Sequence, residues 1–353
     1  IVHLTFKMPV DVQGTFVSQK INKIRWIPEE YTETKHFFTG SWDDDQNSVK
    51  VWTFESPESD EDVEYPRQLS EFTVDGDVTE MKYTQWSGGP TIAVSSSDGQ
   101  VRLLQFSYDK FNVEAPLDVV FTWDNLHKYG ETQCSCTSLD TMESEIATVG
   151  EDGNIFILNV RTSAITRSIE GADSCSLHSI CFIKLNEIIT GNIRGHMKIW
   201  DIRSNSNKPS ASFLLAGDEL AATCIVCHPT QPHIVLAGSE SGSLALWDLR
   251  MNQFPTSLLN AHAAGVTEMQ FHPENPNKLL TCSLSGEVWD WNVESLTKKT
   301  AENWMPLDDK NPMPVNSLMP TLHKSINTIN CDKGRILCGA DNEAIYLIKN
   351  FKY

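Results

Sequence analysis

Residues 146–158 read Ile146-Ala-Thr-Val-Gly-Glu-Asp-Gly-Asn-Ile-Phe-Ile-Leu158, and this stretch decides the fold because its pattern recurs along the chain. An alternating apolar run enters a turn of glycine and aspartate, and a second alternating run follows. Period-two alternation around a tight turn predicts an antiparallel hairpin. Five copies place a large apolar residue five positions after a turn glycine: Gly99 before Leu104, Gly153 before Leu158, Gly195 before Trp200, Gly242 before Trp247 and Gly286 before Trp291.

Two further copies keep the pattern without the glycine and end at Trp52 and Ile348, so the repeat occurs seven times. Successive copies are about 42 to 57 residues apart, and one blade of a repeat propeller takes about 40 to 45 residues. The sequence therefore predicts an all-β protein, a single seven-bladed β-propeller. Because repeats of this kind pack only on their neighbours, we expect the four tryptophans of this position to be buried between blades: Trp52, Trp200, Trp247 and Trp291.

Two of the copies carry a Trp-Asp signature in register, Trp200-Asp-Ile-Arg203 and Trp247-Asp-Leu-Arg250. Val226-Cys-His-Pro229 and Gln270-Phe-His-Pro273 are similar to the corner between the first and second strands of such repeats. The chain thus resembles the WD40-repeat family. The set of His, Ser or Thr, Asp and Trp that the family links by hydrogen bonds is incomplete: blade 6 has His262 and Trp291 but Ser285 in the turn position, and blades 2 and 3 have Asp98 and Asp152 but leucine in place of Trp.

The last repeat has only three strand-like runs before the chain stops at Tyr353. An open blade would expose unpaired backbone groups at its edge. The only unassigned strand-like run is Thr15-Phe-Val-Ser18, so we expect residues 15–18, with Phe16 and Val17, to complete blade 7. Residues 1–14 would then be an N-terminal tail and residues 15–353 the propeller.

Composition limits the function. Asp and Glu total 47 against 28 Lys and Arg, a net charge of −19, which argues against direct nucleic-acid binding because that affinity comes chiefly from neutralising phosphates. No segment approaches 18 consecutive apolar residues, so membrane insertion is not expected. Nine cysteines, mostly in strand-like runs, are typical of buried reduced thiols. The Cys224-Ile-Val-Cys227-His228 stretch matches a haem attachment pattern and Cys134-Ser-Cys136 half a zinc pattern, but strand register and spacing disfavour both.

We therefore expect no cofactor and no metal. Recognisable catalytic motifs are also absent from the sequence, which favours a protein that is not an enzyme. Residues 55–64 are strongly acidic and include Ser56 and Ser59, which suit either a solvated loop or kinase sites. Two insertions add most of the extra length, residues 108–133 and 294–324. The second carries Trp304, Met305, Met313 and Met319, and because aromatic and Met side chains are enriched in interface centres, these are the candidate partner-binding residues. The same residues equally suit packing onto the propeller itself.

The whole chain from about Phe16 to Phe351 resembles the forty-three-kilodalton WD-repeat nucleoporins of animals. The resemblance lies in Phe16-Val-Ser-Gln-Lys-Ile-Asn-Lys-Ile-Arg-Trp26, Thr39-Gly-Ser-Trp-Asp43, Thr148-Val-Gly-Glu-Asp-Gly153, Ser257-Leu-Leu-Asn-Ala-His262 and Cys338-Gly-Ala-Asp-Asn-Glu-Ala-Ile-Tyr346. It implies a structural subunit of the Y-shaped outer ring of the nuclear pore, docked on an α-solenoid nucleoporin of the short arm. It also implies residence at the nuclear envelope and, in mitosis, at kinetochores.

A rival interpretation is a substrate receptor of a cullin-type ubiquitin ligase. Receptors of that class are similar to this chain in a paired Trp-Asp-x-Arg motif, here ending at Arg203 and Arg250. The simpler interpretation is that each arginine only caps its strand. Loss of a ligase adaptor on Arg203→Ala or Arg250→Ala would distinguish the two.

Overall fold

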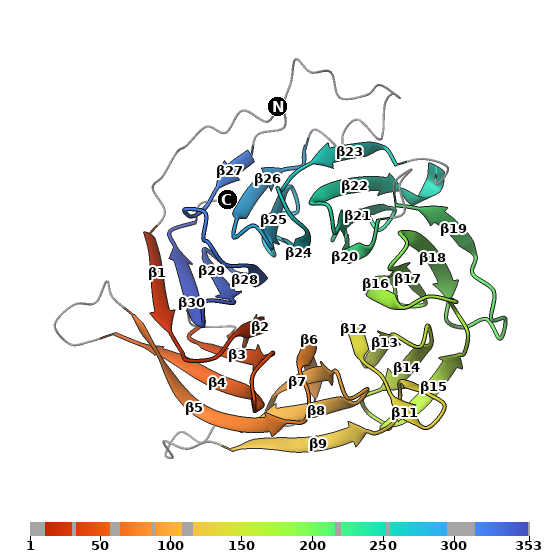
Figure 1. Cartoon of the computed structure of the whole chain (residues 1–353), viewed down its shortest axis with the longest axis horizontal. Coiled ribbons are helices and arrows are strands. Elements are labelled where there is room, and N and C mark those ends of the chain that lie inside the picture. Colours follow the sequence, from red (N-terminus) through yellow and green to blue (C-terminus); the bar gives the residue numbers. More distant parts are fainter. Residues whose placement is uncertain are drawn as a thin grey trace.

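The structure is a computed structural model that describes residues 11–29, 33–56, 64–86, 89–107, 116–215, 220–251, 255–294 and 315–351. Seven four-stranded antiparallel sheets stand around a central axis like the blades of a propeller (Figure 1). The chain is thus an all-β, seven-bladed WD40-type propeller, as the repeat predicts. Each blade begins with its innermost strand and proceeds outward, except the last blade.

The blades follow the chain in order. Blade 1 contains β2 (Ile21–Trp26), β3 (His36–Ser41), β4 (Asn47–Glu55) and β5 (Tyr65–Val74). Blade 2 contains β6 (Val78–Trp86), β7 (Gly89–Ser96), β8 (Val101–Phe106) and β9 (Leu117–Trp123). Blade 3 contains β12 (Cys136–Met142), β13 (Glu145–Gly150), β14 (Ile155–Asn159) and β15 (Ala164–Ile169). Blade 4 contains β16 (Leu177–Lys184), β17 (Glu187–Asn192), β18 (His196–Asp201) and β19 (Ala211–Leu214).

Blade 5 contains β20 (Ala222–Cys227), β21 (Ile234–Ser239), β22 (Ser243–Asp248) and β23 (Ser257–Asn260). Blade 6 contains β24 (Val266–Phe271), β25 (Lys278–Ser283), β26 (Val288–Asn292) and β27 (Val315–Ser317). Blade 7 contains β28 (Ile326–Asp332), β29 (Arg335–Ala340) and β30 (Ala344–Lys349), with β1 (Asp11–Phe16) outermost. A small hairpin of β10 (Lys128–Tyr129) and β11 (Thr132–Gln133) and one 3-10 turn, Leu249–Met251, complete the described elements.

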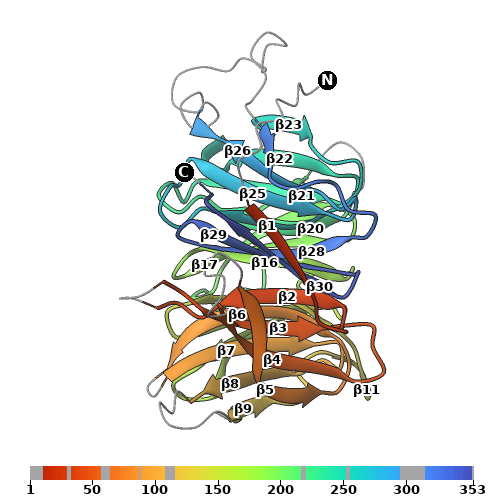
Figure 2. The ribbon, with the colours of Figure 1, turned by 90° about the vertical axis from the view of Figure 1, so that its left-hand side faces the viewer.

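The N-terminal strand closes the ring, as Figure 2 shows from the side, where β1 lies beside β30. The pairing runs from Asp11 opposite Lys349 to Phe16 opposite Ala344, and Val17 N–H adds a bond to the Glu343 carbonyl. The prediction of a strand at residues 15–18 preceded by a tail through residue 14 is wrong in its bounds. Because β1 is an edge strand exposed along much of its length, its sequence carries only a weak alternating pattern.

A cyclic set of hydrogen bonds joins the innermost strands of neighbouring blades. In all seven blades the innermost strand has a β-bulge at its second residue. In six blades the bulged residue's side chain donates to a backbone carbonyl of the next blade, and in blade 4 Ser179 does so beside the bulged His178. The seven donor–acceptor pairs are Asn22–Val78, Thr79–Cys136, Thr137–Leu177, Ser179–Ala222, Thr223–Val266, Thr267–Ile326 and Asn327–Ile21.

Two faces follow from this topology. The turns between the second and third strands, together with the crossovers between blades, lie on one side, which we call the turn face. The connections from first to second strand and from third to outer strand lie on the other, which we call the loop face. Part of the predicted insertions belongs to the blades: β9 lies within residues 108–133 and β27 within residues 294–324. These outer strands were missed because the repeat pattern is defined by the inner hairpin.

Candidate functional site: the central channel and the two faces

The four anchor tryptophans are all buried, and three of them make the same kind of hydrogen bond within their own blade. The indole Nε1–H of Trp52 donates to Thr39 Oγ1, that of Trp200 to Thr190, and that of Trp291 to Thr281, at 2.8, 3.0 and 2.9 Å. The threonine stands on the neighbouring second strand of the same blade. In blade 5 Ala237 takes this place, and Trp247 Nε1 is buried without a hydrogen-bond partner among the described residues.

Two buried histidines extend this set. His262 lies 3.0 Å from Glu287 Oε2 through Nδ1 and 2.8 Å from Thr281 Oγ1 through Nε2. Ser285, the predicted turn residue, only donates to that carboxylate, so Glu287 replaces the aspartate of the family pattern. The His262 contact, opposed by burial, lowers the pKa of Glu287.

Blade 3 has a matching arrangement that sequence reasoning missed. His127 lies 2.9 Å from Asp152 Oδ1 and 3.1 Å from Thr148 Oγ1, although the anchor is Leu158. The spacing of Thr148 and Asp152 is a sequence signal for this arrangement, because the same spacing occurs in other blades. The histidine is harder to find, since the β10–β11 hairpin separates it from the first strand of blade 3.

The strongest electrostatic feature lines the central channel. Arg25 of blade 1 contacts Glu80 of blade 2 at 2.6 Å and Glu268 of blade 6 at 2.5 Å through Nη2. Its Nη1 also reaches Thr328 of blade 7 at 3.2 Å, and its Nε donates to the Met81 carbonyl at 2.7 Å. All of these side chains are buried. One guanidinium therefore links four blades across the seam at which the ring closes.

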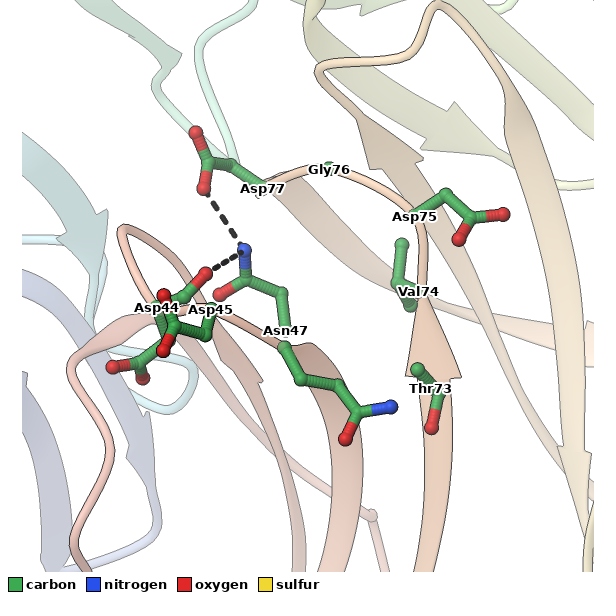
Figure 3. A pocket seen from close by; sticks show the side chains of 9 residues that line it. Asp44, Asp45, Asn47, Thr73, Val74, Asp75, Gly76 and Asp77 are labelled. Carbon is green, nitrogen blue, oxygen red and sulfur yellow. Dashed lines mark hydrogen bonds between the residues drawn. The ribbon is translucent and has the colours of Figure 1, made fainter.

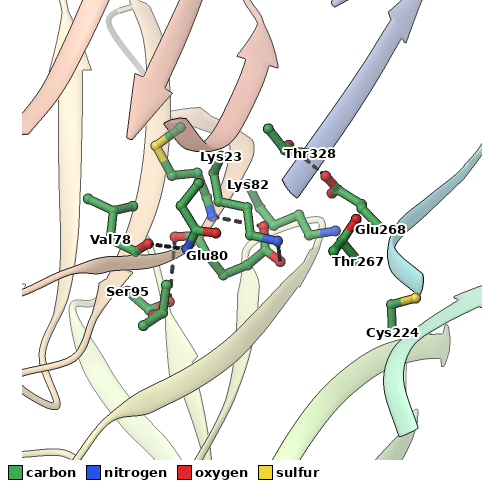
Figure 4. Close-up of polar contacts among 12 residues, drawn as sticks. Lys23, Val78, Glu80, Lys82, Ser95, Cys224, Thr267, Glu268 and Thr328 are labelled. Atoms are coloured by element: carbon green, nitrogen blue, oxygen red, sulfur yellow. Dashed lines mark hydrogen bonds and ion pairs between the residues drawn. The ribbon is translucent and has the colours of Figure 1, made fainter. Parts of the chain in front are cut away.

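Further charges balance the channel. Lys23 Nζ lies 3.3 Å from Glu80 Oε2, and Thr328 donates to Glu268 at 2.6 Å; Figure 4 shows these side chains grouped across several inner strands. Burial alone would raise the pKa of Glu80, but Lys23 and Arg25 hold it at about 2. The adjoining cavity has a volume of only about 80 Å³. The ionised groups neutralise one another, so we interpret them as a structural network that holds the inner strands of blades 1, 2, 6 and 7 together.

An acidic hollow lies between blades 1 and 2 on the turn face (Figure 3). Asp44, Asp45, Asp75 and Asp77 line it, and Asp77 Oδ1 accepts hydrogen bonds from Asn47 Nδ2 at 3.0 Å and from Asp43 N–H at 2.8 Å. Among the described residues no group of three or more His, Cys, Asp or Glu has the arrangement of a metal site. None of the described helices is long and apolar enough to cross a membrane.

The chain is similar along its length to curated nucleoporins. It is 32% identical to human Nucleoporin Nup43, covering 96% of this chain and 99% of that protein, and equally identical to the mouse protein. The chain belongs to the Nup43 family. The Dictyostelium discoideum Nuclear pore complex protein nup43 is 23% identical over 95% of this chain. No protein-family model matches the sequence.

Membership of the Nup43 family supports a nucleoporin role and does not favour the ubiquitin-ligase interpretation. In this Nup43-family chain Arg203 lies 3.3 Å from Asp201, and Arg250 lies 2.5 Å from Asp248. Each arginine thus pairs with the aspartate of its own motif and caps the end of its strand, while its side chain remains exposed.

Of the four predicted partner-binding residues, the structure describes one, Met319. Trp304, Met305 and Met313 lie outside the described residues, as does most of the acidic stretch 55–64. Met319 is buried in the core of blades 6 and 7 with Leu318 and Ile326, which matches the alternative of packing onto the propeller itself. Its apolar character reflects packing under the blade crossover.

The closure residues differ from each other. Phe16 is the last residue of β1 and is 66% exposed, whereas Val17 follows the strand and packs against the core shared by blades 7 and 1. Closure therefore comes from the backbone ladder of β1 and not from burial of Phe16.

The cysteines carry no site in the described residues. All nine are free, including the haem-like pair Cys224 and Cys227. Burial raises the pKa of Cys224 to about 12 and of Cys227 to about 11, which keeps both thiols protonated and poorly reactive.

Proposed function

We propose that this chain is a non-catalytic docking subunit of the Y-shaped outer-ring scaffold of the nuclear pore. It anchors to an α-solenoid nucleoporin of the short arm, supports nucleocytoplasmic transport, and accompanies the outer ring to kinetochores in mitosis. The observation that carries the proposal is the similarity to Nup43 proteins over 96% of the chain. The resemblance supplies the outer-ring placement and the α-solenoid partner.

The site chemistry supports a binding role over a catalytic one. In the channel, Arg25, Glu80 and Glu268 satisfy one another, and the space beside them is small. The histidines of blades 3 and 6 are likewise engaged by threonine and carboxylate oxygens. A closed ring whose channel charges are paired with one another leaves its two rims for recognition of a protein partner.

Affinity purification of the tagged full chain from its own cells tests the proposal. We expect stoichiometric outer-ring nucleoporins and a signal at the nuclear rim in interphase and at kinetochores in mitosis. Purification of the folded protein without any outer-ring subunit would contradict it. Replacement of residues 295–314 by Gly and Ser tests that loop separately, since loss from the rim is expected only if Trp304, Met305 or Met313 contacts the partner.

A further inference from the structure

A groove opens on the loop face between blades 4 and 5, with a volume of about 460 Å³. Blade 4 contributes Ile183 from the end of β16 and Ile199 from β18, and blade 5 contributes Pro232 and Leu249. These four side chains form the apolar part of the lining, and Glu187, Ser210 and His233 are among its polar residues. Burial of the two isoleucines shows that the blade core continues directly to the groove.

Two long apolar side chains extend this surface outward. Leu185 follows Lys184 of the groove and is 42% exposed, and Met251 follows Arg250 and is 50% exposed. Isolated exposed apolar residues need no explanation, but here each of the two directly follows a residue that lines a partly apolar hollow formed by two blades. Together they provide the anchor positions that a protein partner would cover.

Cations face outward around this groove. The side chains of Lys184 and Arg250 are 59% and 55% exposed, whereas the carboxylates that pair with them, Glu187 and Asp248, are 37% and 5% exposed. Arg203 of the neighbouring motif is also more exposed than Asp201. A partner approaching the groove therefore meets positive charge, although the chain as a whole carries −19.

The turn face differs from the surroundings of this groove in its local charge. Its turns and crossovers carry solvent-facing or half-buried carboxylates in several blades: Asp43, Asp44, Asp45, Asp75, Asp77, Asp98, Asp124, Glu151 and Glu240. Because exposed charges are screened beyond about 8 Å at physiological salt, a partner senses the rim it approaches and not the net charge. The groove on the loop face therefore differs in local charge from the turn face, although the loop face carries exposed carboxylates elsewhere, among them Glu33, Glu55, Glu143 and Glu274.

We propose that the groove between blades 4 and 5 docks an acidic amphipathic segment of a protein partner. Apolar side chains of that segment fill the hollow between Leu185 and Met251, and its carboxylates meet Lys184, Arg203 and Arg250. This inference rests on the proposed function, in which the segment belongs to a helix of the α-solenoid nucleoporin. It adds the face, the groove and the charge of the partner surface.

Binding of the purified full chain to the purified short-arm α-solenoid nucleoporin of the same organism tests the inference. Leu185→Asp combined with Met251→Asp should weaken binding at least about tenfold, as expected for buried interface anchors. Arg250→Glu should weaken it as well, and the loss should shrink as salt rises from about 50 to about 300 mM. The matched control is Ile193→Asp with Leu284→Asp, two exposed apolar residues of the turn face, which should leave affinity unchanged.

The outcomes separate the two proposals. If the Leu185 and Met251 double variant binds with the affinity of the wild type, the groove is not the docking site, and the proposed function still stands. Loss of binding in the Ile193 and Leu284 control variant would also contradict docking at the groove. A wild-type chain that does not bind the α-solenoid overturns the proposed partner and this inference together. Unchanged melting temperatures in all variants exclude unfolding, which is expected because each substituted side chain is exposed.

Discussion

At the scale of single residues, Arg25 has the largest predicted effect. It is buried and neutralises Glu80 and Glu268 from two other blades. Removing one member of a buried ionic set leaves uncompensated charge and typically costs about 3 to 5 kcal/mol. We expect Arg25→Met to lower the free energy of unfolding by that amount in urea denaturation.

Arg203→Met is the matched control for this prediction. Arg203 is largely exposed and pairs with Asp201 of its own strand end, so the urea midpoint of Arg203→Met should equal that of the wild type. An Arg25→Met protein with a wild-type midpoint would show that the channel network contributes nothing to stability.

Glu80 gives a pH dependence. Its pKa is about 2 in the folded protein and 4.5 ordinarily, because Lys23 and Arg25 outweigh the effect of burial. A carboxylate whose pKa is lowered by folding stabilises the fold at pH values above its ordinary pKa. This contribution disappears as pH falls from about 4.5 to about 2. Glu80→Gln should therefore lower the urea midpoint strongly at pH 7 and much less near pH 2.5. An equal decrease at both pH values would contradict the assignment.

Sequence reasoning located the repeat positions better than the residues that complete them. Trp52, Trp200, Trp247 and Trp291 were found from spacing because a large apolar residue after a turn is a strong local signal. Glu287 was not, since its carboxylate reaches His262 from the first position beyond the turn glycine instead of the usual turn position. Contacts between blades, such as that of Arg25 with Glu268, join residues 243 apart and leave no local pattern.

At the scale of elements, the anchor tryptophans differ in one hydrogen bond. Trp200 Nε1–H donates to Thr190, whereas Trp247 Nε1–H has no hydrogen-bond partner in the described part of the chain, where Ala237 replaces the threonine. A buried hydrogen bond contributes about 0.5 to 1.5 kcal/mol. Trp200→Phe should therefore cost about that much more than Trp247→Phe, measured by urea unfolding followed by far-UV circular dichroism. Equal costs would mean that the indole bond is energetically neutral.

The closing strand is the other prediction at this scale. Deletion of residues 1–16 removes β1 and leaves the β30 edge unpaired, while deletion of residues 1–10 retains the whole strand. We expect a lower melting temperature and aggregation of the first protein relative to the second. Identical melting curves would refute closure by β1.

A substitution tests the same strand without truncation. Gly14 lies against the Tyr346 ring, and a Cβ placed there would approach Tyr346 Cε1 to 2.9 Å. Gly14→Val should therefore destabilise the propeller, whereas a substitution at exposed Phe16 should have little effect. Because a glycine within a run argues against a strand, the sequence pattern predicts the closing strand only after Gly14, at residues 15–18.

At the scale of the whole molecule, the ring has no end at which unfolding can begin without breaking an inter-blade contact. Linear repeat arrays are stabilised by neighbour contacts and lose cooperativity as they lengthen. Here the innermost strands are joined in a complete circle, from Asn22–Val78 through Asn327–Ile21, and Arg25 spans the seam. Disruption of one blade therefore removes its contacts with the blades on both sides.

This closed circle predicts a single unfolding transition even in weakened variants. Trp247→Ala in blade 5 should cost about 3 to 5 kcal/mol, as for other buried aromatic truncations, and Arg25→Met weakens the opposite side near the seam. Each variant should unfold in one step, with coincident curves from tryptophan fluorescence and far-UV circular dichroism. Two separated transitions in either variant would show that the blades unfold independently, so that the inter-blade bonds do not couple them. A docking platform that depends on a groove between two blades requires the coupled behaviour, because the groove walls keep their spacing only while the ring is closed.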